Sequence, residues 1–184
     1  MKIACYGRGN IGGGLGRLWE RVGHEVTLLG SEGGDVSAAE VVLLAVPGGA
    51  VAEALEKVSG IEGKTVIDAT NLWGGARPPE GFDSNAEFVK HRTGGSTAKA
   101  FNINFAALFG RLDKASSRPS DIWCGDEGAR EAVERLTRDA GYEPVCAGPL
   151  TNAAMQEGFL PLVFAIKEAE GEPFLYRMAP PERL

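Results

Sequence analysis

Short apolar runs alternate with amphipathic stretches along the chain. The run VVLLAV at Val41–Val46 contains no polar residue, as expected for a strand that is buried on both faces of a parallel sheet. Further strands are predicted at Lys2–Tyr6, Glu25–Leu29, Thr65–Ala69, Thr97–Phe101, Asp121–Cys124 and Tyr142–Cys146. Helices are predicted between these strands and after the last one, at about 10–22, 50–58, 84–90, 105–112, 126–140 and 151–168.

Strands that alternate with helices indicate an α/β fold of the Rossmann type, with a doubly wound, mostly parallel sheet and a C-terminal helical extension. We expect a single dinucleotide-binding domain over residues 1–184, in which residues 149–184 form the extension. Gly33–Glu40 makes the second crossover short, because only about ten residues link the second and third strands and a helical crossover needs at least that many. We therefore expect an open pocket at the adenosine end of a bound dinucleotide.

Some helix starts are marked by residue type. Ser84 followed by Glu87 forms a capping box, in which the two side chains bond the free N–H groups of the first turn. Asp126 is a typical N-cap residue for the helix after it. Thr151 and Asn152 are expected to cap the last helix.

A glycine motif lies directly after the first predicted strand. Gly7, Gly9 and Gly12 have the spacing G-x-G-x-x-G and precede a predicted helix, which is the context that makes this motif informative. The first glycine permits a tight turn, the second lets a diphosphate approach the backbone, and the third lets the helix pack closely on the strand. The helix, with Asn10 as its expected N-cap, would present free N–H groups to the diphosphate. The motif predicts dinucleotide binding.

Composition limits the class of ligand. The net charge of −6 offers no overall positive field for nucleic acid or for an anionic membrane surface. No apolar run approaches the ~20 residues of a membrane-spanning helix, and the N-terminus does not have the form of a signal peptide. Cys5, Cys124 and Cys146 are far apart and form no C-x-x-C pair. We expect a cytoplasmic protein with reduced cysteines and no nucleic-acid or membrane partner.

Motifs at the ends of the predicted strands are similar to those of a known family. They are NIG at 10–12 with GHEVTLLGS at 23–31, AVP at 45–47, DATN at 68–71, KAFN at 99–102, CGDEGARE at 124–131 and GPLTNAAMQEGFLPL at 148–162. With these motifs in this order, the chain resembles the NADP-dependent reductases of the deazaflavin coenzyme F-420 over nearly its full length. The same architecture also occurs in the cytoplasmic domains of membrane ferric reductases, so the fold alone does not fix the acceptor.

The resemblance implies an oxidoreductase that transfers hydride between NADP and a deazaflavin or flavin acceptor. We expect it to act as a homodimer, because the last helix is largely apolar. The residues expected to bind the dinucleotide are Gly7, Arg8, Gly9, Asn10, Ile11, Gly12, Ser31, Glu32, Ala45, Val46, Pro47, Asn71, Ala100 and Asn102. On the last helix, Met155 and Phe159 lie one turn apart and are expected to face the acceptor, although such an apolar stripe is more often simple core.

Polar residues end two neighbouring predicted strands. Ligands of doubly wound sheets lie beyond the carboxyl ends of the strands, so Asn71 and Asn102 are expected to hydrogen-bond the nicotinamide ribose or carboxamide. The alternative is that each forms an Asx turn. Lys99 is expected to point out of the end of the sheet. Hydride transfer depends on alignment and water exclusion more than on a side-chain acid. His24 and His91 show no triad or metal pattern, so we predict no catalytic residue and no metal site.

The residues after the second strand bear on the choice between NADP and NAD. Gly30 stands where an NAD enzyme has an acid for the ribose diol, which favours NADP. The resemblance leads us to expect Ser-Arg next, whereas the chain has Ser31 and then Glu32. Arg8 is expected to supply the missing cation and clamp the 2′-phosphate; the alternative is a solvated surface arginine. If Glu32 instead binds the ribose diol, the cofactor is NAD.

Two other functions fit the same sequence. A reductase of another acceptor, such as a ferric chelate or a quinone, would use the same fold and cofactor. A non-catalytic NAD(P) sensor that acts through a partner protein would be compatible with the missing arginine and the short crossover.

Overall fold

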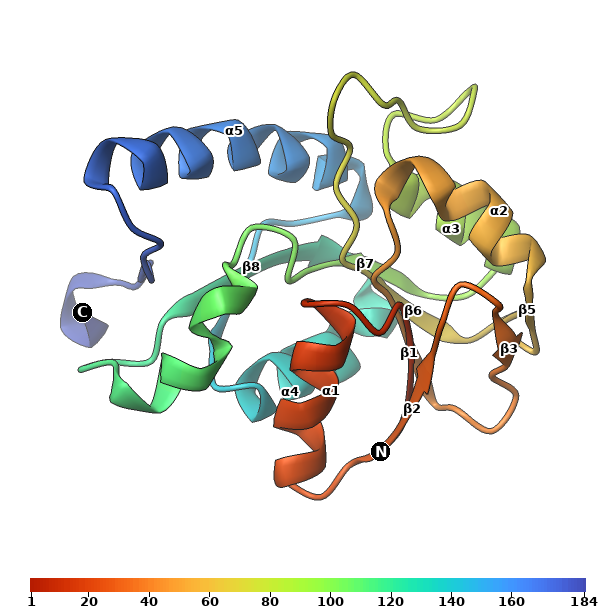
Figure 1. The fold of residues 1–184 in the computed structure, drawn as a ribbon, viewed down its shortest axis with the longest axis horizontal. Helices are drawn as coiled ribbons and strands as arrows, with labels where there is room; N and C mark the ends of the chain where they lie inside the picture. The colour runs from red at the N-terminus through yellow and green to blue at the C-terminus, as the bar shows by residue number, and fades with distance from the viewer.

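A seven-stranded sheet forms the centre of the protein, whose computed structural model describes residues 1–184 (Figure 1). The strand order is β2-β1-β4-β6-β7-β8-β9, and all neighbours are parallel except β7 and β8. The strands are β1 (Lys2–Tyr6), β2 (Glu25–Leu29), β4 (Val41–Leu44), β6 (Thr65–Asp68), β7 (Thr97–Lys99), β8 (Ser120–Gly125) and β9 (Glu143–Cys146). The predicted Rossmann-type α/β fold with a mostly parallel sheet is confirmed.

Helices cover both faces of this sheet. They are α1 (Gly12–Arg21), α2 (Val51–Glu56), α3 (Asn85–Thr93), α4 (Arg130–Asp139) and α5 (Ala153–Glu170). Successive residues of a strand point to opposite faces, so Ile3 and Cys5 of β1 belong to one core whereas Ala4 and Tyr6 belong to the other. Helices α1 and α4, with the 3-10 helix Ala106–Lys114, cover the first core, and α2 and α3 cover the second. The sheet is therefore doubly wound.

The strand order reverses at β1. The chain runs from β1 outward to β2 and then crosses back to β4 on the other side of β1. In sheets of this kind the ligand crevice lies at such a reversal, beyond the carboxyl ends of the strands. The carboxyl ends of β1 and β4 therefore border the expected crevice.

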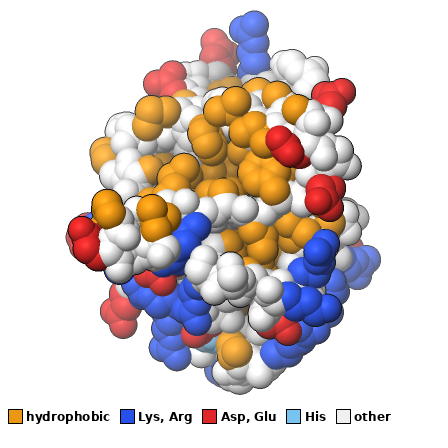
Figure 2. Space-filling view, turned by 90° about the vertical axis from the view of Figure 1, so that its left-hand side faces the viewer, with side chains coloured by type: hydrophobic (Ala, Val, Ile, Leu, Met, Phe, Trp, Pro, Cys, Tyr) orange, Lys and Arg blue, Asp and Glu red, His pale blue; other side chains and the backbone are white.

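Helix α5 lies along the top of the molecule in Figure 1. The buried residues of α5 are Ala153, Gln156, Leu160 and Val163. Large hydrophobic side chains that stay exposed on it are Met155, Leu162, Phe164 and Ile166. Figure 2 shows hydrophobic side chains gathered on the upper part of the molecule's end face, with Lys and Arg side chains below them. Neither α5 nor any other helix is long and apolar enough to cross a membrane.

The predicted helix start at Ser84 is confirmed, whereas Asp126 precedes the next helical segment as predicted but does not cap it with its side chain. Ser84 caps α3, because its Oγ accepts the backbone N–H of Glu87 at 3.2 Å. Asp126 precedes a 3-10 turn rather than α4 itself and makes no capping bond. Its carboxylate instead accepts the N–H of Thr97, at 2.9 Å. This carboxylate thus links the turn before α4 to the start of β7.

Two expected asparagine caps are also wrong. Helix α1 begins at Gly12, and Ile11 rather than Asn10 occupies the N-cap position, without a side-chain bond. Asn10 belongs to the turn of the glycine loop, which leaves the helix start open. Asn152 directly precedes α5, but its side-chain amide donates to the carbonyl of Ala147 at 2.6 Å. It therefore anchors the preceding loop instead of capping the helix.

The crossover between β2 and β4 contains no helix, as its length suggests. Within it, β3 (Gly34–Asp35) pairs with β5 (Val58–Ser59) in a separate two-stranded sheet. Lys64 holds the next turn in place by donating to the carbonyls of Ser37 and Ala39, at 2.8 Å and 2.7 Å. An extended segment, rather than a helix, therefore follows β2.

Candidate functional site

The glycine loop has the geometry that each of its glycines was expected to permit. Gly7 has a φ of 111°, and a Cβ at this residue would lie 2.2 Å from the carbonyl oxygen of Ala45. A Cβ at Gly12 would lie 1.8 Å from the carbonyl oxygen of Gly7, so α1 begins in close contact with the loop. Around Gly9 no atom lies within 4 Å of such a Cβ. The middle glycine therefore faces open space, as a backbone that a ligand approaches should.

The start of α1 has backbone N–H groups that could bind an anion, while that of Gly13 already donates to the carbonyl of Gly9 at 2.9 Å. No side chain caps this helix, and its first turn contains no acidic residue. The first N–H groups of a helix have no intrahelical partners and carry the positive end of the helix dipole. Here these groups lie at the carboxyl end of β1, beside the point where the strand order reverses. A diphosphate fits this position.

A cleft of about 460 Å³ opens next to the glycine loop. Its lining is mostly apolar and consists of Ile11, Ala45, Val46, Pro47, Gly48, Gly49, Ala69, Thr70, Asn71, Trp73 and Ala76. The residues predicted from the glycine loop, from AVP and from DATN therefore meet at one place. A larger hollow of about 680 Å³ lies between β9 and the C-terminal tail, and it shares no residue with the glycine loop. We assign the candidate site to the smaller cleft because the glycine loop borders it.

Asn71 and Asn102, predicted at neighbouring strand ends, are paired with each other. The amide nitrogen of Asn71 donates to the backbone oxygen of Asn102 at 2.7 Å, and that of Asn102 donates to the side-chain oxygen of Asn71 at 3.0 Å. Gln156 of α5 joins them, donating to the side-chain oxygen of Asn102 at 2.8 Å. Ala100, two residues earlier, packs its side chain into the core beneath α1, so only its backbone is available to a ligand.

The turn that carries Asn102 is supported by a buried carboxylate. Phe101 has a φ of 60°, a left-handed conformation that costs energy in a residue with a large side chain. Its N–H donates to Oδ1 of Asp121 at 3.2 Å, and the same oxygen accepts from Asn104 at 2.7 Å. Burial raises the pKa of Asp121 to about 7. The strained turn and its support were not predicted from the sequence.

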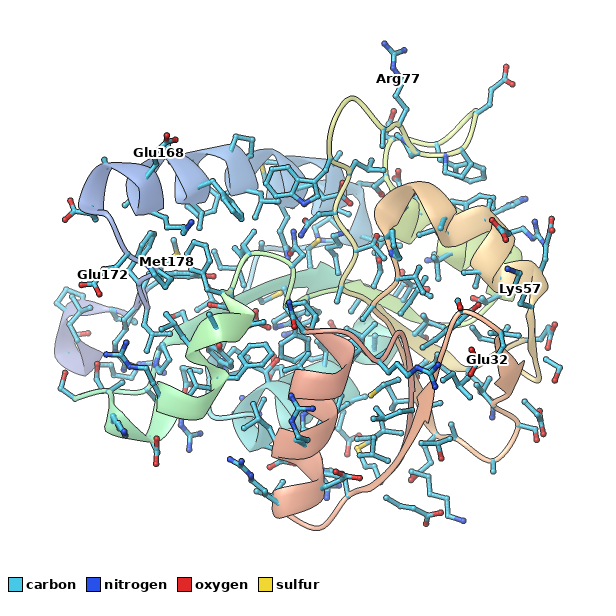
Figure 3. All side chains as sticks on the ribbon, viewed as in Figure 1. Glu32, Lys57, Arg77, Glu168, Glu172 and Met178 are labelled. Atoms are coloured by element: carbon cyan, nitrogen blue, oxygen red, sulfur yellow. The ribbon has the colours of Figure 1, made fainter.

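The other end of the site contains the residues that bear on the adenosine ribose. Arg8 and Glu32 face each other with Nη1 and Oε1 3.6 Å apart, and both side chains are largely exposed. A Cβ at Gly30 would lie within 3 Å of both groups, so the glycine leaves room for this pair. Lys57 lies at the same end of the molecule (Figure 3) but is paired with Glu53 at 2.6 Å. Ser31 is exposed beside them.

Lys99 does not point out of the sheet, and that prediction is wrong. Its side chain is fully buried and its ammonium donates to Oδ2 of Asp68 at 2.9 Å, because Asp68 and Lys99 are register partners at the ends of β6 and β7. It also donates to Oε1 of Glu157 on α5 at 2.5 Å. Both strand-end residues stand in DATN and KAFN, so their pairing could have been inferred from the sequence. Glu157 carried no such signal.

The two residues predicted on the acceptor side do not line the cleft. Met155 is 65% exposed, and Phe159, one turn later on the same side of α5, is half-buried. Their role toward an acceptor stays a prediction. Phe164 instead reaches the cleft wall, with its ring centroid 4.9 Å from that of Trp73.

The histidines lie away from the cleft. His24 is buried at the amino end of β2, where its Nε2 lies 2.8 Å from Oδ2 of Asp139 and its Nδ1 lies 3.2 Å from the N-terminal nitrogen of Met1. His91, in the last turn of α3, packs its ring against Phe82. The structure contains no cluster of three side chains suited to a metal ion.

Comparison with known proteins supports the fold through solved structures only. No family model matches the chain, and no curated protein matches its sequence. A candidate F-420-dependent NADP reductase from Arthrobacter sp. FB24 is similar over 98% of this chain and 100% of that chain, with a TM-score of 0.79 and 22% identity. The hypothetical protein SMa0349 from Sinorhizobium meliloti is similar over 84% and 88% of the two chains, with a TM-score of 0.66 and 26% identity.

A reductive aminase from Aspergillus terreus, in complex with NADPH and ethyl-5-oxohexanoate, has a TM-score of 0.66 and 14% identity. The match covers 92% of this chain but only 62% of that one, so this chain spans less than two thirds of the aminase. At these identities the likeness establishes the fold. The chain therefore shares its Rossmann-type fold with the Arthrobacter protein and with the matched 62% of this aminase.

Proposed function

We propose that this chain is an NADP-linked oxidoreductase that passes hydride between the nicotinamide and a deazaflavin or flavin acceptor. One observation carries the proposal: Ile11, which lies between the open backbone of Gly9 and the uncapped start of α1, lines an apolar cleft at the reversal point of the sheet. The loop amides would hold the diphosphate. The nicotinamide, which supplies the hydride when bound, would lie in the cleft near Pro47 and Asn71. The reductase folds described above support this assignment.

The walls of the cleft would contribute alignment and exclusion of water to such a reaction. Pro47 and Ala45 give the cleft a stiff, apolar wall, and Trp73 with Phe164 extends it toward α5. Asn71 is fixed by its bonds to Asn102, so the amide pair can orient a polar edge of a ligand with little loss of side-chain freedom.

NADP is favoured over NAD by the geometry at Arg8. The Arg8–Glu32 pair is exposed and 3.6 Å apart, and an exposed ion pair of this kind contributes little stability. A 2′-phosphate would replace this contact with charge-assisted, bidentate hydrogen bonds to the guanidinium. Glu32 would then be the competitor of the phosphate for Arg8.

Arg8→Ala is therefore expected to weaken NADPH binding by at least about tenfold and to leave NADH binding nearly unchanged, since a hydrogen bond to a charged group is worth ~1.5–3 kcal/mol. Glu32→Gln is expected to strengthen NADPH binding, because it frees Arg8 and removes a negative charge that faces the phosphate. Fluorescence titration with both dinucleotides measures these effects.

Arg135→Ala is the matched control for these titrations. Arg135 forms an exposed pair with Asp139 at the same 3.6 Å separation, but on α4, away from the glycine loop. It should leave both affinities unchanged. If wild type prefers NADH and Glu32→Gln weakens that preference, Glu32 binds the ribose diol and the cofactor is NAD.

Turnover separates the proposed activity from its rivals. We expect wild-type protein to oxidise NADPH with a deazaflavin or with FMN as acceptor, followed by absorbance. Turnover with only a ferric chelate or a quinone would replace the acceptor assignment. Tight NADPH binding without turnover on any of the four would identify a sensor instead of an enzyme.

A further inference from the structure

The beginning of α5 is joined to the sheet by a buried ionic network. The ammonium of Lys99 donates to three oxygens: Oδ2 of Asp68 at 2.9 Å, the carbonyl of Thr70 at 2.5 Å and Oε1 of Glu157 at 2.5 Å. The side chains of Lys99 and Asp68 are fully buried, and that of Glu157 is 11% exposed. All three donors of the ammonium are thereby used. Buried charges are costly, so a network of this kind at a strand-end cleft is a candidate functional feature.

The network has one cation and two carboxylates, so it carries a net negative charge when both acids are ionised. Asp68 has a second hydrogen-bond partner, because its other oxygen accepts the N–H of Thr70 at 2.9 Å. Glu157 has only the ammonium. Burial raises the pKa of Glu157, Lys99 opposes this rise, and the charge of Asp68 adds to it. Glu157 is therefore the member of the network that takes up a proton most readily.

Glu157 lies on the cleft side of α5. It precedes Phe164 by seven residues, which is two helical turns, so the two side chains share one side of the helix. Phe164 touches Trp73, a cleft residue, and Lys99 is bonded to the carbonyl of Thr70, another cleft residue. Glu157 is thus the one side chain of the network with an exposed fraction, and Lys99 connects its carboxyl group to the cleft residue Thr70.

Reduction of a deazaflavin or flavin requires a proton as well as a hydride. We infer that Glu157 exchanges this proton with the acceptor, and that Lys99 and Asp68 are the positioning residues that hold its carboxyl group. The inference rests on the proposed function. In the direction of acceptor reduction, the acceptor gains a bond to the transferred hydride and its two electrons. Glu157 breaks its O–H bond and gives the proton to a ring nitrogen of the acceptor, and its carboxylate then takes a proton from water.

Three ionisable groups face Glu157 from the packed elements: Lys99 on β7, Asp68 on β6 and Cys124 on β8. Burial raises the pKa of the Cys124 thiol to about 12, so it stays neutral at ordinary pH. Glu157 combines a raised pKa with a partly exposed side chain, so we expect it to be the acid of the network that exchanges a proton with solvent.

The test compares wild type with Glu157→Gln, whose amide oxygen can still accept from Lys99 but which carries no exchangeable acid proton. Glu168→Gln on the same helix is the control, because Glu168 is exposed and points away from the sheet (Figure 3). Glu157→Asp is the second variant, which keeps the acid on a shorter side chain. Circular dichroism melting shows whether each variant folds, and NADPH titration shows whether each binds cofactor.

Two measurements decide the role of Glu157. The first is the rate of single-turnover reduction of a deazaflavin, measured as a function of pH and in D₂O. The second is the infrared carboxylic-acid band of the protein without cofactor. It is recorded as a function of pH for wild type and for Glu157→Gln, and the variant spectrum is subtracted from the wild-type spectrum. We expect Glu157→Gln to bind NADPH normally, to slow the transfer roughly 100-fold and to lose both the pH dependence and the solvent isotope effect. We expect Glu157→Asp to keep the pH-dependent limb at a lower rate. The infrared difference should show an acid that titrates above the ordinary glutamate range.

Retention of the wild-type rate and pH profile by folded Glu157→Gln overturns the inference and leaves the proposed function intact. An infrared difference without a titrating acid also overturns it, whatever the activity. Absence of turnover by wild type with either ring system overturns the inference together with the proposed function. If Glu157→Gln does not fold, loss of the pH-dependent limb in Glu157→Asp supports a purely structural role and overturns the inference.

Discussion

At the scale of single residues, Asp121 shows how one carboxyl group can support a binding site that it does not touch. It accepts the N–H of Phe101, whose left-handed conformation brings Asn102 beside Asn71. It is fully buried, and the nearby hydroxyl group of Tyr142 has no hydrogen-bond partner. Burial raises the pKa of Asp121 from 3.8 to about 7. The stability of the protein should therefore depend on this residue's proton.

The sign of this dependence follows from the two pKa values. Between about pH 4 and pH 7 the folded protein holds a proton on Asp121 that the unfolded chain has lost, so the stabilising effect is complete below pH 4 and is lost as the pH rises through 7. Asp121→Asn, which retains the amide oxygen as an acceptor, should remove most of the fall in Tm between pH 5 and pH 8. Asp113→Asn, at an exposed position, is the control. An unchanged slope in Asp121→Asn would contradict the assignment.

The same scale explains which residues of the candidate site were predictable from the sequence. Gly7, Gly9 and Gly12 were, because each role follows from the spacing and from the absence of a Cβ. Lys99 was not read correctly. One of its partners, Asp68, follows from strand register, but Glu157 is 58 residues away and meets it only through the packing of α5.

At the scale of elements, the helix starts show two different uses of the same unsatisfied N–H groups. Helix α3 begins with Ser84, which satisfies one of them locally and ties the helix start down. Helix α1 has no capping side chain. An uncapped start weakens a helix, but it leaves donors for an anion. A sequence rule that places Asn10 as a cap fails here because the glycine loop places it in the preceding turn.

Ser84→Ala should therefore destabilise the protein by about 1 kcal/mol, within the ~0.5–2 kcal/mol measured for loss of an N-cap. Urea unfolding measures the change. Thr151→Ala is the control, because Thr151 is exposed before α5 and α5 has no side-chain cap to lose. Equal effects of the two substitutions would show that the Ser84 bond contributes nothing specific.

At the scale of the whole molecule, the sheet could be predicted and the arrangement of α5 could not. β1 and β2 have the bounds expected from the sequence. Residues Ile3–Tyr6 of β1 are buried, as expected for a central parallel strand, whereas β2 is an edge strand that contains no fully buried residue. Helix α5 is apolar on two sides, and sequence periodicity does not say which of them meets the sheet. The structure buries Leu160 and Val163 and exposes Leu162 and Ile166.

The expected homodimer is a prediction about that exposed side of α5. The double substitution Leu162→Lys and Ile166→Lys should convert a dimer into a monomer. An apolar patch that is buried between two copies cannot accept two charges per copy without a large desolvation cost. Light scattering after size-exclusion chromatography measures the mass. Leu184→Lys is the control at an exposed terminal position. A monomeric mass for the wild-type protein would contradict this prediction.

The crossover without a helix has a consequence for the handling of the cofactor. In a fuller Rossmann domain a helix after β2 would lie beside a bound adenine, whereas here β2 is followed by an extended segment that contains β3. The N6 edge of the adenine would then face solvent, and a chemical linker attached there would meet no protein. NADP immobilised on a resin through its adenine should therefore capture this protein and release it to free NADPH. The immobilised cofactor could then hold the protein on the resin through its adenine end, while its nicotinamide end stays in the cleft for the reaction.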